Sequence, residues 1–340
     1  MHCLTSLCAI NIGLDPDEKG YVSAICLVSR ARFPTLGVLQ VDIQEMESIR
    51  TLNLNHLYGR EIGTCTLLRE LARGSMGVLF VAYQRTLKRQ IAVKILPRTV
   101  LTPFTAERFR QEAESAAILS HPNIVTVYEA GETKEFLYIL MQLVQGQSLA
   151  ERLRLIKNHV LPSRRILPIR TTLRIITEVL GALDYAHRQD IIHRDIKPAN
   201  ILLENNTDRP LITDFGLAIT AHGPGENVGV GSPVYMAPEQ MWRGHVDGRA
   251  DIYATGMTLF EMLVPNLPLP PYLTQEELFR LKFQVEEHLF QKAPSRLNPK
   301  LHWEIDEIVL KAILPEPEKR YATCAEFLEA LTGYEKRRLR

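Results

Sequence analysis

The feature that most constrains this chain is a pair of polar clusters on either side of a short apolar stretch. The first cluster reads His193-Arg-Asp-Ile-Lys-Pro-Ala-Asn200 and leads directly into Ile201–Leu203. The second reads Leu211-Ile-Thr-Asp-Phe-Gly216 and follows shortly afterwards. A chance surface loop rarely holds so many ionisable side chains at this spacing. We therefore expect the fold to bring the two clusters around one centre.

The side chains of these clusters suit the transfer of a phosphoryl group. Asp214 and Asn200 offer oxygen ligands of the kind that Mg²⁺ accepts while it shares its shell with phosphates. Asp195 can accept the proton of an attacking hydroxyl group. Lys197 can neutralise negative charge on the group in transit. The two clusters thus predict a metal-assisted phosphoryl-transfer site.

A glycine-containing stretch lies far upstream, at Leu71-Ala-Arg-Gly74-Ser-Met-Gly77-Val-Leu79. Glycines between two strands allow backbone N–H groups to approach a polyphosphate without obstruction by a Cβ atom. A turn of this kind is more often only a β-hairpin. By itself, this stretch leaves both interpretations open.

A single lysine interrupts the apolar stretch Ile91–Leu96. Burial of Lys94 without a partner would be costly, so its ammonium group needs a nearby anion. Glu112, in a helix predicted over Phe104–Ser120, is the candidate partner. A lysine held by a carboxylate could fix the phosphates of a nucleotide as a point charge. A lysine that extends to solvent and a solvated helix glutamate are the alternative interpretation.

Composition excludes several other classes of protein. The 340 residues carry a net charge of +1, so bulk charge favours neither nucleic acid nor an anionic membrane. No apolar run approaches the roughly 18–20 residues that span a bilayer, so no membrane span is expected. The cysteines, none of them in a C-x-x-C pair, favour free thiols in a cytoplasmic protein over a zinc site or a disulfide framework. They are Cys3, Cys8, Cys26, Cys65 and Cys324.

Secondary-structure signals divide the chain into three regions. Residues 1–60 are weakly patterned and carry no assignable chemistry, and Met46 is an alternative start. From about residue 62 to 144, strand signals surround one helix. After Gly146 the pattern is mainly helical. The outline is a small sheet-rich part followed by a larger helical one.

Individual elements can be predicted within these regions. Strands are expected at 66–71, 78–83, 91–96, 124–129 and 136–143, the last two joined at Gly131. Thr323 and Glu326 form a capping box ahead of a final helix. One buried stripe of a long helix is formed by Leu173, Ile176, Leu180, Leu183 and His187.

Taken as a set, these strings resemble the signature motifs of the eukaryotic-type (Hanks-type) serine/threonine protein kinases found in bacteria. The resemblance extends over about residues 62–335. Further matches are His121-Pro-Asn-Ile-Val125, Met141-Gln-Leu-Val144, Gly231-Ser-Pro-Val-Tyr-Met-Ala-Pro-Glu239, Asp251-Ile-Tyr-Ala-Thr-Gly256 and Pro317-Glu-Lys-Arg320. In this family, the residue at position 239 pairs with Arg320, and Asp251 braces the catalytic loop.

The resemblance implies an α+β fold, the two-lobed protein-kinase fold. A small N-lobe over residues 61–144 would contain an antiparallel sheet and one main helix. A larger, mostly helical C-lobe would occupy residues 145–340. Residues 1–60 would be an N-terminal extension of unknown role.

The resemblance also implies an activity, the transfer of the ATP γ-phosphate to Ser/Thr hydroxyls of protein substrates in bacterial signalling, with Mg²⁺ or, alternatively, Mn²⁺. Asp195 would be the catalytic base, Lys197 would contact the γ-phosphate, and Asn200 and Asp214 would hold the metal. A lysine two residues after the base is typical of Ser/Thr rather than tyrosine kinases. The implied ATP-binding residues are Leu71, Ala72, Arg73, Gly74, Ser75, Met76, Gly77, Val78, Leu79, Ala92, Lys94, Glu112, Met141, Gln142 and Val144.

Two departures from the family pattern carry information. Ala72 replaces the first glycine of the loop motif, which a strand position should tolerate with a modest effect on nucleotide affinity. The stretch Ala221–Gly231 contains no Ser, Thr or Tyr that could be phosphorylated. We hypothesise that Glu226 pairs with Arg194 in place of a phosphorylated residue, while a solvated glutamate is the alternative. Ser232 would line the acceptor site.

Two other functions compete with an active protein kinase. A pseudokinase scaffold normally lacks one of the essential side chains, whereas Lys94, Asp195, Asn200 and Asp214 are all present. A small-molecule kinase shares the two-lobed plan, but Lys197 and the Ala-Pro-Glu string argue against it. The sequence leaves the substrate protein and the oligomeric state open.

Overall fold

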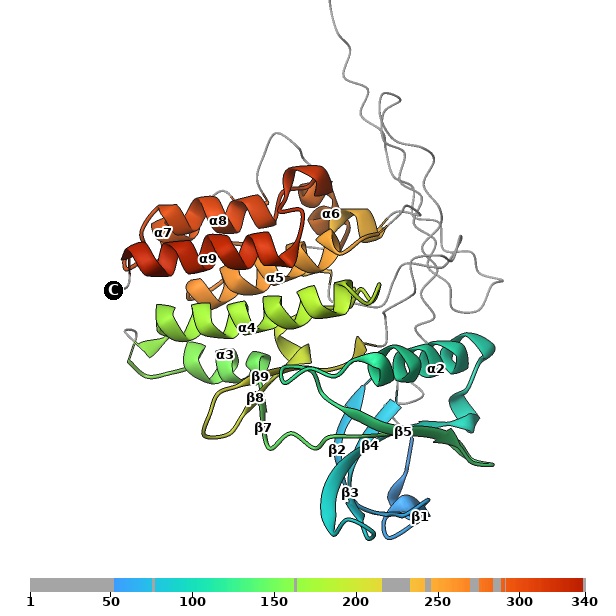
Figure 1. Cartoon of the computed structure of the whole chain (residues 1–340). Coiled ribbons are helices and arrows are strands. Elements are labelled where there is room, and N and C mark those ends of the chain that lie inside the picture. The colour runs from blue at the N-terminus through green and yellow to red at the C-terminus, as the bar shows by residue number, and fades with distance from the viewer. Residues whose placement is uncertain are drawn as a thin grey trace, which may run out of the picture.

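The computed structural model describes residues 52–74, 77–161, 164–215, 233–241, 246–269, 275–283, 289–290 and 292–338. Within these residues, an antiparallel sheet with one long helix precedes a mainly helical part (Figure 1). The α+β, two-lobed arrangement predicted from the sequence is confirmed.

The N-terminal sheet has the strand order β1-β2-β3-β4-β6-β5, with every neighbouring pair antiparallel. Its strands are β1 (Glu61–Ile62), β2 (Cys65–Gly74), β3 (Gly77–Gln84), β4 (Arg89–Pro97), β5 (Val127–Glu132) and β6 (Phe136–Met141). The strand expected to begin at Ile124 begins at Val127 instead. Ile124 forms a separate bridge to Ile212.

The predicted joint between the last two strands is wrong. Gly131 lies inside β5, opposite Tyr138 of β6. The chain turns at Thr133, whose hydroxyl accepts hydrogen bonds from the N–H groups of Glu135 and Phe136. A threonine that closes a turn through its own side chain is the local signal that identifies this position.

Helix α2 (Pro103–Ile118) is fixed at its start by a capping box. The Thr102 hydroxyl accepts from the Thr105 N–H at 3.1 Å, and the Thr105 hydroxyl accepts from the Thr102 N–H at 2.9 Å. The proline at the first helical position has no N–H to leave unsatisfied. Phe109 and Ala113 anchor the helix in the apolar core of the sheet, which orients the intervening Glu112.

The C-terminal part is mainly helical. Its helices are α3 (Leu149–Lys157), α4 (Ile169–His187), α5 (Arg249–Leu263), α6 (Gln275–Phe283), α7 (Pro294–Leu297), α8 (Glu304–Ala312) and α9 (Cys324–Arg338). Almost every residue of α5 is buried, because α4, α8 and α9 contact it. Figure 1 shows α4, α9 and α8 stacked in layers.

Two sequence expectations for these helices are confirmed in outline. The predicted stripe of α4 is buried, apart from the half-buried His187 at its end. The Thr323 hydroxyl accepts from the Glu326 N–H at 3.2 Å ahead of α9. The Glu326 carboxylate, however, accepts from the N–H of Ala322 rather than from that of Thr323, so the box is offset by one residue.

A small second sheet lies beside α3 and determines the positions of Asn200 and Asp214, which flank two of its strands. It consists of β7 (Gly146–Ser148), β8 (Ile201–Glu204) and β9 (Pro210–Ile212), in that order. The backbone of Ile212 accepts from Val125 and donates to Asn123, which ties this sheet to the residues that lead into β5. Asn200 consequently lies just before β8 and Asp214 just after β9.

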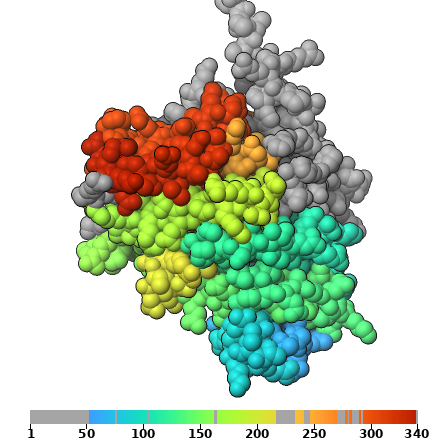
Figure 2. All heavy atoms as spheres, viewed as in Figure 1, coloured from blue at the N-terminus to red at the C-terminus, as the bar shows by residue number. Residues whose placement is uncertain are grey.

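Two groups of buried apolar residues form separate cores. One lies in the N-terminal part and includes Leu54 and Leu57, which precede β1. The other lies among the helices. The space-filling view shows the sheet residues, in blue to green, in contact with the helical part, in yellow-green to red (Figure 2). Among the residues described, none of the helices has both the length and the apolar character needed to span a membrane.

Candidate active site

Lys94 lies at the junction of the two parts, on the central strand β4 between Leu79 of β3 and Ile139 of β6. Its Nζ is 2.6 and 2.7 Å from the two carboxylate oxygens of Glu112, and 3.1 Å from Oδ1 of Asp214. Lys94 is only 9% exposed and Glu112 only 4% exposed. The structure therefore pairs the two residues, and the alternative of a solvated lysine and a solvated glutamate is excluded.

Lys94 and Asp214 stabilise each other's charge, whereas burial keeps the pKa of Glu112 raised. Burial alone would lower the pKa of Lys94, but the carboxylates of Glu112 and Asp214 outweigh it and the pKa is raised. Desolvation alone would raise the pKa of Asp214, but Lys94 outweighs it and the pKa is lowered. Lys94 thus stays protonated and Asp214 stays ionised at neutral pH.

Asp195 is held by two polar side chains of its own loop. Lys197 donates to Oδ2 of Asp195 at 2.6 Å. The Asn200 amide nitrogen donates to the Asp195 carbonyl at 2.8 Å and to Oδ2 at 3.0 Å. Burial raises the pKa of Asp195, and Lys197 opposes this only in part. A carboxylate with a raised pKa is a better proton acceptor than an ordinary one.

Asp251 of α5 holds the loop of Asp195 in place through its carboxylate. Its carboxylate accepts from the N–H groups of His193 at 2.9 Å and Arg194 at 2.8 Å, and it contacts Nε2 of His187 at 2.7 Å. Arg194 has φ +65°, a left-handed conformation that a non-glycine residue adopts only at a cost. Burial alone would raise the pKa of Asp251, but the hydrogen bond to His187 opposes it and the pKa is lowered. The expected bracing role of Asp251 is seen directly.

His193 joins the two polar clusters that the sequence singled out. Its Nε2 lies 2.9 Å from the Thr213 carbonyl, and its ring meets the Phe215 ring edge-on at 4.6 Å between centroids. Both His193 and Phe215 are buried. These contacts fix the distance between the loop of Asp195 and the segment of Asp214, although Gly216 itself lies outside the described residues.

The described residues of the glycine-containing stretch form the end of β2 and the start of β3. Gly74 pairs with Gly77, which has φ +131° and whose Cβ, if present, would lie 2.6 Å from the Ile95 carbonyl oxygen. Only glycine fits there. Ala72 is an ordinary strand residue opposite Leu79, as expected. The predicted nucleotide contacts Ser75 and Met76 lie outside the described residues.

The other residues predicted to bind ATP occupy different settings. Ala92 and Met141 face each other across β4 and β6, and Val78 is buried in β3. The N–H of Gln142 donates to the Thr126 carbonyl at 2.8 Å. In this structure the Arg73 guanidinium is engaged by the Glu70 carboxylate at 2.6 and 2.7 Å. Leu71 is 43% exposed, and Val144 packs partly buried against the sheet core.

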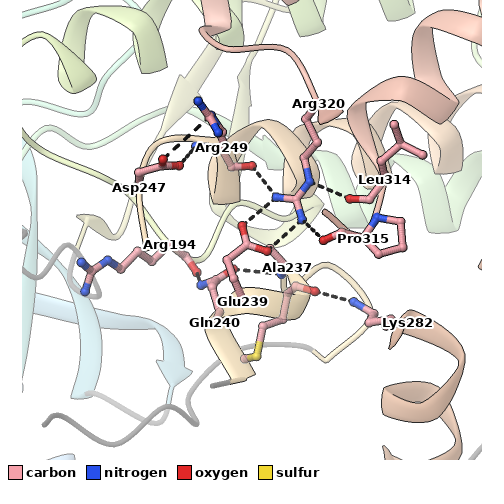
Figure 3. Close-up of polar contacts among 11 residues, drawn as sticks. Arg194, Ala237, Glu239, Gln240, Asp247, Arg249, Lys282, Leu314, Pro315 and Arg320 are labelled. Carbon is pink, nitrogen blue, oxygen red and sulfur yellow. Dashed lines mark hydrogen bonds and ion pairs between the residues drawn. The ribbon is translucent and has the colours of Figure 1, made fainter. Parts of the chain in front are cut away.

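A second ion pair, which the family resemblance led us to expect, stabilises the helical part (Figure 3). The Arg320 guanidinium binds both oxygens of Glu239, at 2.6 and 2.8 Å, and also three backbone carbonyls. Close by, the Gln240 side chain donates to the Arg194 carbonyl at 2.7 Å. Segment 233–241 is thereby fastened to the loop of Asp195. Gln240 was not predicted from the sequence.

Two hypotheses concern residues that the structure does not describe. The proposed contact of Glu226 with Arg194 and the position of Ser232 both fall in residues 216–232. They stay predictions.

The fold combines a lysine–carboxylate pair with an aspartate loop that Asp251 holds in place. A family model described as "Protein kinase domain" matches residues 65–331, and the chain belongs to this family. Protein kinase domains use ATP with a divalent metal ion and act on proteins.

Known proteins of this family resemble the chain closely. The "Probable serine/threonine-protein kinase SCO3848" of Streptomyces coelicolor is 38% identical over 75% of this chain and 37% of that protein. The serine/threonine-protein kinase PrkC of Bacillus subtilis is 34% identical over 81% of this chain and 41% of that protein. The chain therefore spans about two fifths of the length of these relatives.

A solved structure shows the same fold. The PknI kinase domain of Mycobacterium tuberculosis superimposes with a TM-score of 0.64 at 29% identity, covering 82% of this chain and 98% of that one.

Proposed function

We propose that this chain is a serine/threonine protein kinase that transfers the γ-phosphate of ATP to hydroxyl groups of other proteins in bacterial signalling. One observation carries the proposal. Glu112 of α2 and Asp214 after β9 both lie within 3.1 Å of the Lys94 ammonium, although the three residues are far apart along the chain. In protein kinases the lysine–glutamate pair and the metal-binding aspartate must both be in place for transfer.

The oxygen atoms of the site fit a divalent metal ion. The Asn200 amide nitrogen is engaged by Asp195, which leaves Oδ1 available as a ligand. Asp214 contacts Lys94 through Oδ1, and its side chain is 44% exposed. Hard oxygen donors of this kind suit Mg²⁺, which we propose as the metal with Mn²⁺ as a substitute. When bound, the ion would neutralise phosphate charge and orient the γ-phosphate.

The residues of the chain supply the remaining chemistry. Lys94 would hold the α- and β-phosphates, and the backbone at Gly74 and Gly77 would cover them. Asp195 would orient the acceptor hydroxyl and take its proton. Lys197, already hydrogen-bonded to Asp195, would offset charge on the transferred group.

Labelled ATP tests the proposal, with casein or myelin basic protein as acceptor and Asp195→Asn as the inactive variant. We expect transfer to fall by about 10²–10⁴-fold, the usual contribution of a general base. Asp190→Asn, the same change at an exposed neighbour, is the matched control. Phosphoamino-acid analysis should find phosphoserine or phosphothreonine. Equal transfer by the wild type and Asp195→Asn would refute the proposal, and phosphotyrosine would refute its Ser/Thr part.

The same assay separates the competing functions. A pseudokinase would bind ATP without any transfer, and a small-molecule kinase would label an aminoglycoside but neither protein. Parallel reactions with Mg²⁺ and Mn²⁺ decide the metal. A cytoplasmic location also belongs to the proposal, supported by the buried free thiols of Cys65 and Cys324. Cell fractionation tests it, and recovery in the membrane fraction would contradict it.

A further inference from the structure

A lysine that the sequence analysis did not single out is almost completely buried among the helices. Lys282 of α6 is 1% exposed. Its Nζ donates to the Val234 carbonyl at 2.8 Å and also to the Met236 carbonyl, and it lies 5.0 Å from the centre of the Tyr253 ring. Figure 3 shows the side chain reaching from its helix towards segment 233–241. Lys282 therefore binds backbone rather than another side-chain charge.

The electrostatic setting of Lys282 differs from that of an ordinary buried lysine. No carboxylate in the described part of the chain forms an ion pair with it. Burial and the nearby Arg320 lower its pKa to about 7. A neutral amine keeps two N–H donors and an ammonium has three. Both protonation states can therefore hold the two carbonyls.

Tyr235, the residue between Val234 and Met236, lines a hollow beside the catalytic loop. Tyr235 and Pro198 line a cavity of about 330 Å³ together with residues of α3. The Tyr235 hydroxyl donates to Glu261 of α5, which also binds Lys157 at 2.6 Å. Tyr235 is thus fixed through its hydroxyl on one side, and through the backbone on both sides of it by Lys282.

The far end of the same segment is tied to the loop of Asp195. The Gln240 side chain accepts from the Ala237 N–H at 2.9 Å and donates to the Arg194 carbonyl. Segment 233–241 is therefore a bridge between α6 and the catalytic loop, with Tyr235 in the wall of the hollow.

We propose that Lys282 is a positioning residue for the protein acceptor. By holding the Val234 and Met236 carbonyls, it sets the wall of the hollow against which an acceptor polypeptide lies next to Asp195. Acceptor binding then depends on Lys282, and nucleotide binding, which uses Lys94 and the β2–β3 turn, does not. This inference rests on the proposed kinase function.

Steady-state kinetics of Lys282→Met tests the inference, with casein as the acceptor. We expect the KM for casein to rise about tenfold, which corresponds to about 1.4 kcal/mol of acceptor binding, while the KM for ATP stays within about twofold. Lys282→Arg keeps donors for the carbonyls and should recover part of the lost affinity. Lys311→Met removes an exposed lysine that also lies over an aromatic ring and should change neither constant.

A second measurement does not depend on activity. Hydrogen exchange of the amides in segment 233–241 should be faster in Lys282→Met than in the wild type, without nucleotide or acceptor. Unchanged exchange there would overturn the inference, as would an unaltered casein KM or a parallel rise of the casein and ATP constants. If the wild type transferred no phosphate, the kinase proposal would fail, and the exchange data would still decide whether Lys282 holds the segment.

Discussion

Two lysines are buried in the part of the chain that the structure describes, one at the junction of the two parts and one among the helices, and their charges have different partners. Lys94 lies against the carboxylates of Glu112 and Asp214. Lys282 lies against two carbonyl dipoles and the face of Tyr253. The full charges raise the pKa of Lys94, whereas burial lowers the pKa of Lys282 to about 7.

The difference shows what each lysine is suited to do. A lysine whose charge is secured by carboxylates can present that charge to a further anion, such as a phosphate. A lysine whose charge is barely compensated is a poor ion-binding group, but its N–H donors still order a stretch of backbone. Burial alone therefore does not indicate function. The nature of the partner does.

The largest expected effect follows from replacing Lys94 by Met. Phosphoryl transfer should fall by about 10²–10³-fold, because the cation that holds the phosphates is gone. The protein should also lose about 3–5 kcal/mol of unfolding free energy, because Glu112 is left buried without its partner. Labelled-ATP assays and urea unfolding measure the two losses.

The double variant Lys94→Met/Glu112→Leu separates these two effects. Replacing a buried ion pair by apolar side chains is often neutral for stability, so the double variant should regain most of the lost stability. It should remain inactive. A double variant that recovers transfer would show that Lys94 serves only the fold and would remove it from the phosphate site.

A smaller effect, on stability alone, is expected from Arg320→Met. Arg320 is a C-terminal counterpart of Lys94, because it too binds both oxygens of a carboxylate, that of Glu239. The loss of Arg320 should lower the unfolding free energy by about 3 kcal/mol and the melting temperature by on the order of 10 °C. Lys282 lies over the same Tyr253 ring, but Lys282→Met should not lower the melting temperature. Arg188→Met breaks an exposed ion pair with Asp184 and is the control, with a change below about 1 kcal/mol. Equal melting temperatures for Arg320→Met and Lys282→Met would show that a cation paired with a carboxylate and one bound to carbonyls contribute alike to stability.

The pair of Lys94 and Glu112 has a local signal in the sequence, although a solvated lysine and a solvated glutamate remained the alternative until the structure excluded them. A lone ammonium in an apolar strand needs an anion, and the helix that follows offers one. The pairs of Arg320 with Glu239 and of Asp251 with the catalytic loop were predicted differently, through the family resemblance. Nothing in their spacing alone would have brought these residues together.

The sequence could not predict the role of Lys282. It lies in Glu277-Leu-Phe-Arg-Leu-Lys282, where charged neighbours suggest a solvated helix face. Its burial arises from packing against Val234 and Met236, which are distant in the chain. The burial of Leu54 in the sheet core was missed for the same reason, because contacts set by tertiary packing leave no periodic pattern.

The smallest effect is a pH dependence that distinguishes the two lysines. In the unfolded chain both should titrate near the ordinary value of about 10.4. Lys282 has a folded pKa of about 7, so above that pH the unfolded chain binds more protons than the folded protein, and stability rises with pH. Below pH 7 Lys282 is protonated in both the folded and the unfolded state, so its contribution to the unfolding free energy is constant and at its lowest. Lys94 has a raised folded pKa, so its contribution is complete at neutral pH and lost only well above it.

Urea unfolding of the wild type and of each lysine-to-methionine variant, at pH values from about 6 to about 9, measures these contributions. The difference in unfolding free energy between the wild type and Lys282→Met should be flat below neutrality. It should then increase by at most about 1.4 kcal/mol per pH unit. The difference between the wild type and Lys94→Met should stay flat throughout this range. Subtracting the unfolding free energy of each variant from that of the wild type cancels the other groups that titrate in this pH range. A Lys282 difference that stays flat above neutrality would mean that carbonyl dipoles keep a buried ammonium protonated as well as carboxylates do.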